Sequence, residues 1–166
     1  MPLCRLCRQD RDLRESHIAP AFFFRWLKAT SATGYVRFSQ RPNVRIQDGP
    51  KMQLLCDDCE QRIGGWERAF ADGVFHPFVD GAHPPIRYGP WMALFAASLC
   101  WRVVEFLNSQ GAGAFSEYDV VDANLVSTAQ LRWSRFMLGM DDIPGKHELH
   151  CLPLGRIVNV VGPPPA

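Results

Sequence analysis

The chain has 166 residues, of which 47% are hydrophobic and 21% are charged, and its formal net charge is +1. This composition supplies enough apolar side chains for a buried core, and it excludes a disordered, collagen-like or disulfide-rich small protein. The longest apolar stretch, residues 91–100, is shorter than the roughly 20 residues that span a bilayer, and the first residues contain no signal-peptide core. We therefore expect a cytoplasmic protein with no membrane partner.

The small net charge conceals an asymmetry along the chain. Residues 1–70 carry a net charge of +4, and residues 71–166 carry a net charge of −3. A basic front half suits a partner that carries phosphate groups, such as nucleic acid. An arginine-rich face that meets only solvent would give the same count, so the charge pattern leaves both interpretations open.

Four of the six cysteines form two pairs with the same spacing, Cys4-x2-Cys7 and Cys56-x2-Cys59. A two-residue spacer lets both thiolates of a pair face one metal ion from a tight turn, here called a zinc knuckle. Two such pairs complete a four-sulfur shell that has no open position. The pattern therefore predicts a structural Zn²⁺ site, and the alternative is four unrelated buried thiols.

Apolar periodicity predicts the other elements in chain order. After an extended segment at residues 15–20, helices are expected at residues 21–29, 59–73, 91–108 and 124–138. Strands are expected at residues 35–38 and 44–46, with a turn at 41–43, and again within residues 147–161. We divide the chain into an N-terminal zinc module, a Pro/Gly-rich connector and a helical half with short C-terminal strands, at residues 1–76, 77–90 and 91–166 respectively.

The segments around the cysteine pairs resemble a known family. The first pair is followed by Glu15-Ser16-His17-Ile18-Ala19-Pro20, and the second lies in Leu54-Leu55-Cys56-Asp57-Asp58-Cys59-Glu60. The order of knuckle, strand ending in His-Ile-x-Pro, hairpin, second knuckle and helix resembles the zinc-stapled His-Asn-His (His-Me finger) endonucleases. The resemblance implies an α+β fold, in which a treble-clef zinc-binding ββα module at the N-terminus packs on a mainly helical C-terminal half.

The resemblance also implies roles for two residues. In those nucleases the histidine at the strand end is the general base that deprotonates the attacking water, so His17 takes this role here. A catalytic divalent ion, Mg²⁺ or Mn²⁺, stabilises charge on the phosphate. The family's ligand directly after the second knuckle is usually a histidine, and here Glu60 occupies that position with a carboxylate that suits either ion. Two further features depart from the family pattern: Ser16 stands where an acidic residue or histidine is usual, and residues 51–53 lack the expected asparagine.

Both residues also have structural interpretations. For His17 the alternative is a hydrogen bond to a knuckle thiolate or a backbone carbonyl, and for Glu60 it is a first-turn carboxylate favoured by the helix dipole. We expect a metal-dependent endonuclease that cleaves phosphodiester bonds in nucleic acid, and family analogy suggests a bacterial defence or toxin system as its setting. The alternative function is a non-catalytic zinc-binding module that docks on nucleic acid or on a partner protein.

Overall fold

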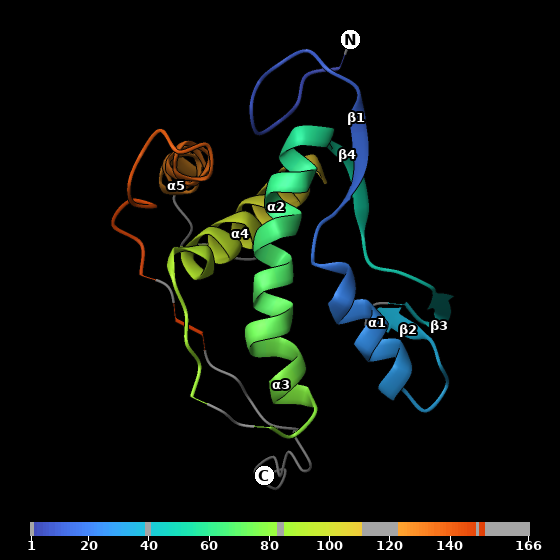
Figure 1. The fold of residues 1–166 in the computed structure, drawn as a ribbon. Helices are drawn as coiled ribbons and strands as arrows, with labels where there is room; N and C mark the ends of the chain where they lie inside the picture. Colours follow the sequence, from blue (N-terminus) through green and yellow to red (C-terminus); the bar gives the residue numbers. More distant parts are fainter. Residues whose placement is uncertain (1, 39–40, 83–84, 111–122, 149, 152–166) are drawn as a thin grey trace, which may run out of the picture.

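The computed structural model describes residues 2–38, 41–82, 85–110, 123–148 and 150–151, and its fold belongs to the expected α+β class (Figure 1). Short strands and one helix occupy the front of the chain, and helices dominate the rest. The elements are β1 (Leu13–His17), α1 (Ala21–Thr30), β2 (Val36–Phe38), β3 (Arg41–Ile46), β4 (Lys51–Cys56), α2 (Asp57–Phe70), the π-helical segment η1 (Ala71–Phe75), α3 (His76–Val79), α4 (Pro90–Ser109) and α5 (Ala123–Met137).

The strands form two separate antiparallel pairs, β1 with β4 and β2 with β3. In the first pair Leu13 lies opposite Cys56 and His17 lies opposite Lys51. One end of this hairpin therefore carries the second zinc knuckle, and the other end carries His17. The β2–β3 pair and α1 are inserted in the chain between β1 and β4, and in Figure 1 they lie below the β1–β4 pair.

Helix α2 begins directly after β4 and runs through the second knuckle. Its first turn contains three acidic residues, which the positive end of the helix dipole favours. Arg14 forms an ion pair with Asp57 at 2.9 Å, and Arg11 forms one with Asp58, so β1 and the segment before it are tied to this first turn.

Two boundaries that we expected from the sequence are wrong. The helix does not stop at Gly73, because backbone turns continue through η1 into α3 and end at Val79. The turn expected at residues 41–43 is the start of β3 instead. Pro42 is tolerated there because, within the described part of the chain, β3 pairs only with β2, and an edge strand can accommodate a residue that lacks an N–H. Of the strands expected within residues 147–161, residues 152–161 lie outside the described part of the chain.

The main core joins the zinc knuckles to the helical half. Trp101 of α4 is 2% exposed, and it lies in one buried cluster with residues of β4, α2 and α5. The members of this cluster are Cys4, Leu6, Leu54, Leu55, Cys56, Cys59, Ile63, Ala97, Trp101 and Met137. A second cluster fastens α1 to α2 and α4, with the rings of Phe70 and Phe95 stacked at 4.0 Å between centroids. The front module is therefore packed on the helical half, as expected.

Helix α4 is the central helix of this half. By length and composition it is also the one described helix that is apolar enough to cross a membrane, a property that core helices share. Here it packs against α2 and α5 and buries two ionisable residues, Arg102 and Glu105. The Arg102 guanidinium donates to the His17 carbonyl at 2.9 Å and lies 2.6 Å from the Glu67 carboxylate. The buried guanidinium thus connects α4, α2 and the end of β1.

Candidate metal centre and candidate active site

The four paired cysteines converge on one point. Their sulfur atoms all lie within 4.8 Å of one another, and the Sγ atoms of Cys7 and Cys56 are 3.8 Å apart. Two sulfurs bound at about 2.3 Å to one tetrahedral zinc ion are separated by about 3.8 Å, whereas a disulfide would bring them to about 2.05 Å. The predicted four-cysteine cluster is confirmed, and its geometry is consistent with structural Zn²⁺.

Local backbone contacts shape the first knuckle. The Arg8 N–H donates to the Cys4 carbonyl at 2.9 Å, which closes the turn, and the Arg5 N–H donates to Leu54 on β4 at 3.0 Å. Arg8 has a φ of 60°, the left-handed region that side chains other than glycine enter at some cost. The turn is thus held in a specific shape that points both thiols at the second knuckle.

Without a cation, the four thiols cannot all lose their protons easily. Burial raises the pKa of Cys4, but backbone N–H donors, led by that of Cys56, outweigh burial and bring it to about 7. Burial also raises the pKa of Cys59, and the neighbouring Cys4 charge raises it further. One thiolate therefore forms readily while the next is opposed, and a bound divalent cation would remove this conflict.

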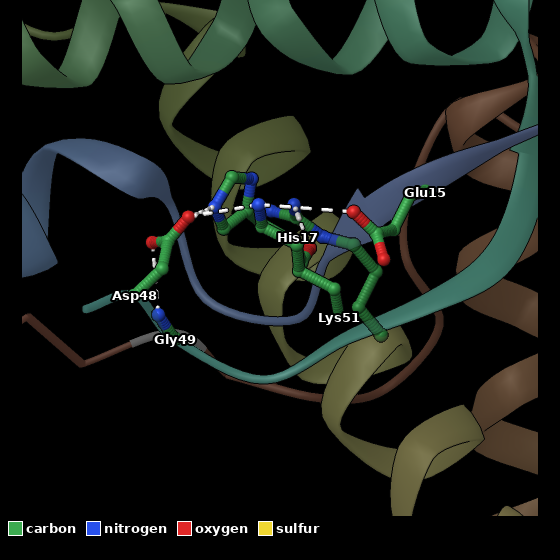
Figure 2. Close-up of polar contacts among 6 residues, drawn as sticks. Glu15, His17, Asp48, Gly49 and Lys51 are labelled. Carbon is green, nitrogen blue, oxygen red and sulfur yellow. Dashed lines mark hydrogen bonds and ion pairs between the residues drawn. The ribbon is translucent and has the colours of Figure 1, made fainter. Parts of the chain in front are cut away.

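At the other end of the β1–β4 pair, His17 contacts the carboxylate of Asp48, which Lys51 also contacts (Figure 2). Its Nε2 atom lies 2.9 Å from Oδ2 of Asp48, and the Lys51 ammonium lies 2.8 Å from the same oxygen. Lys51 is also 3.8 Å from the carboxylate of Glu15. The His17 and Lys51 side chains are 26% and 29% exposed, so both can be reached from solvent.

The Asp48 carboxylate is held in place from several directions. The Lys51 ammonium, with help from His17 and from the Gly49 N–H at 2.8 Å, holds the pKa of Asp48 well below its usual range. The loop has little freedom at Gly49, because a Cβ there would lie 2.1 Å from the ring of Phe24. Asp48 is therefore a fixed anion beside the imidazole.

Glu60 lies in the first turn of α2, on the side of the second knuckle and away from the end of β1. The His17 carbonyl and the Glu67 carboxylate meet at the same Arg102 guanidinium, which puts the Glu67 turn beside the end of β1. Glu60 is seven residues earlier, about 10.5 Å back along the helix axis toward the knuckle. Its Oε1 atom is buried and has no hydrogen-bond partner among the described residues.

The residues around His17 do not fit a catalytic Mg²⁺ or Mn²⁺ as they stand. The carboxylate that contacts His17 is already bonded to an ammonium group, which would repel a divalent ion at that position. Apart from the four cysteines, the described residues contain no group of three or more His, Cys, Asp or Glu ligands close enough to share an ion. The orphaned oxygen of Glu60 could be satisfied by a cation, so its role as a metal ligand stays a prediction.

Sequence reasoning overlooked Asp48 and Lys51. Asp48 was visible only as the first residue of an Asp-Gly-Pro turn, and Lys51 occupies the stretch in which an asparagine was expected. The signal available in the sequence was indirect: an extended segment before the second knuckle must pair with the segment that ends at His17. The register of that pairing is what brings Lys51 opposite His17.

Comparisons of this chain with protein-family models, with curated proteins and with solved structures found no match.

Proposed function

We propose that this protein is an endonuclease that cleaves phosphodiester bonds in nucleic acid, with His17 as its general base. The observation that carries the proposal is the 2.9 Å contact between His17 Nε2 and Asp48 Oδ2 at an accessible end of the zinc-stapled hairpin. In a neutral imidazole one ring nitrogen carries the proton and the other carries a free lone pair. The group that accepts the N–H hydrogen bond therefore determines which nitrogen keeps the lone pair. A contact to an anion is typical of a histidine whose other nitrogen accepts protons.

The chemical step follows from this tautomer. With Nε2–H donated to Asp48, the Nδ1 lone pair is left to take a proton from the attacking water molecule. The new oxygen–phosphorus bond forms as the bond from phosphorus to the leaving oxygen breaks, and that oxygen takes a proton from water. Asp48 stabilises the imidazolium that forms, without itself gaining the proton.

Lys51 supplies a positive charge beside the carboxylate that His17 contacts. Its ammonium carries three donors, of which Asp48 uses one at 2.8 Å, and part of the side chain is open to solvent. A phosphate oxygen placed beside His17 would meet this ammonium. A charge-assisted contact of this kind holds the scissile group and offsets its growing negative charge.

The assay is cleavage of plasmid DNA, single-stranded DNA and RNA by the purified chain, with Mg²⁺, with Mn²⁺ and with EDTA. We expect His17→Ala to abolish cleavage while circular dichroism and zinc content stay unchanged. His150→Ala is the matched control, because His150 also lies beside a carboxylate, Glu148, at 3.2 Å but on an exposed segment. Equal activity in wild type and His17→Ala would overturn the proposal.

The same assay tests the requirement for a catalytic metal. Loss of cleavage in EDTA with zinc retained, together with loss in Glu60→Gln, would support the Mg²⁺ or Mn²⁺ site on Glu60 that the family resemblance implies. Cleavage that persists in EDTA would contradict it. Nucleic-acid binding without cleavage under every condition would favour the alternative, a non-catalytic docking module.

A further inference from the structure

The segment between β1 and β4 has an unusual charge composition. No Asp or Glu occurs between Ile18 and Gln47, whereas five cations do: Arg25, Lys28, Arg37, Arg41 and Arg45. We call the described part of this segment that contains α1, β2 and β3, residues 21–38 and 41–46, the basic lobe. Uncompensated charge of this density is the electrostatic mark of a surface that meets a polyanion.

Most of the charged side chains of the basic lobe are exposed to solvent. Arg25, Arg37, Arg41 and Arg45 are all exposed, and none of the ion pairs in the described part of the chain involves any of the five cations. Two arginines outside the lobe, Arg11 and Arg14, do form ion pairs, with the acidic first turn of α2. The lobe therefore keeps its charge available for a partner.

Apolar and aromatic side chains lie among these cations. On α1 Trp26 is 37% exposed and Leu27 is 40% exposed, and on β3 Val44 is 51% exposed. The Arg45 guanidinium lies over the ring of Tyr35 at 4.9 Å. Rings and guanidinium planes interleaved with phosphate-binding cations are what unpaired bases stack on, and a paired duplex hides those base faces.

The basic lobe is joined to the candidate active site at both ends. Helix α1 begins four residues after His17, and β3 ends two residues before Asp48. The ring of Phe24 on α1 also closes against Gly49, next to Asp48. A strand held on the lobe would thus lead to His17 and Lys51.

From these observations we propose that the basic lobe is a binding surface for single-stranded nucleic acid, which delivers the strand to His17. The proposal rests on the proposed function only for the nature of the substrate. Binding through phosphate contacts and base stacking requires no cleavage, so the two can fail separately.

The test is fluorescence anisotropy with a labelled single-stranded 20-mer and with the matching blunt duplex, using full-length His17→Ala so that the probe stays intact. The lobe variant combines Arg25→Gln, Arg41→Gln and Arg45→Gln. The control variant removes the same charge from exposed arginines outside the lobe, by Arg68→Gln, Arg87→Gln and Arg132→Gln. Circular dichroism and zinc content show whether each variant is folded.

We expect the lobe variant to bind the single strand about 10- to 100-fold more weakly at moderate salt. The slope of log K against log salt concentration should become shallower by about 2. The control variant should lose far less affinity. Trp26→Ala should weaken binding to the single strand about 5- to 50-fold, with a smaller effect on the duplex. Both effects would leave zinc content unchanged.

Equal losses in the lobe and control variants would overturn the proposal, and so would tighter binding of the duplex than of the single strand. If the single strand binds through the lobe but wild type never cleaves it, the proposed catalytic role of His17 fails while the lobe proposal stands.

Discussion

His17 and Asp48 are 31 positions apart in the chain, yet the Nε2 atom of the first lies 2.9 Å from Oδ2 of the second. The antiparallel pairing of β1 with β4 places His17 at the end of a strand, directly beside the loop that contains Asp48. Lys51 contacts the same carboxylate oxygen at 2.8 Å. An imidazole, an anion and a cation therefore form one polar group that solvent can reach.

Asp48→Asn should lower kcat for phosphodiester cleavage by about 10²- to 10⁴-fold, the range typical of general base catalysis. The amide can still accept the Nε2–H hydrogen bond, but it no longer offers a negative charge to the imidazolium. Because Asp48 acts through His17 and not on the substrate, KM should change little. If the variant keeps its kcat and only its KM rises, Asp48 serves substrate binding instead.

The four-cysteine cluster should bind about one Zn²⁺ per chain, since four thiolates complete a closed tetrahedral shell. The Cys56→Ser variant should lose the metal, and its N-terminal zinc module should unfold, because the site joins both knuckles to the core. Cys100→Ser and Cys151→Ser are the controls, as both thiols are free and exposed. Elemental analysis and circular dichroism check the outcome, and a zinc-free wild type that is fully folded would contradict it.

Gly65→Ala should stabilise the protein by up to about 1 kcal/mol, because alanine favours a helix over glycine by that amount. A Cβ at Gly65 in α2 meets no atom within 4 Å, so no contact opposes the gain. Gly49→Ala is the opposite case, since its Cβ would lie 2.1 Å from the Phe24 ring, and it should be destabilising. Urea denaturation of the two variants measures both effects, and a destabilised Gly65→Ala would show that the helix is strained there.

Glu105→Gln tests a buried carboxyl in α4. Burial raises the pKa of Glu105 from its ordinary value of 4.5, although Arg5, Arg8 and the hydrogen bond from Gln130 oppose the shift. The folded state then holds the proton more tightly than the unfolded state, so wild type loses stability as pH rises above about 4.5. The variant has no such proton, and its free energy of unfolding relative to wild type should increase between pH 4 and pH 7. A constant difference across that range would contradict the direction of the shift.

The sequence by itself determined the zinc knuckles and most helices of this protein. Paired cysteines at a fixed spacing are a local pattern, because two residues between thiols suffice to aim both at one ion. The α4 and α5 helices follow from apolar periodicity and were expected within a few residues of their observed bounds. Local propensity also misled, since it placed a helix end at Gly73 and a turn at Pro42, where packing and strand pairing prevailed.

Only the tertiary structure decided the surroundings of His17. Asp48 reaches it because β1 pairs with β4 in one register, and a shift of one residue would turn Lys51 to the other face. Arg102 reaches the His17 carbonyl across 85 positions, through the packing of α4 on α2. Such contacts depend on the relative placement of whole elements, which is set by the shared burial of Trp101 and its neighbours. No local pattern in the sequence encodes them, because core packing constrains volume and burial rather than the identity of the polar groups that meet.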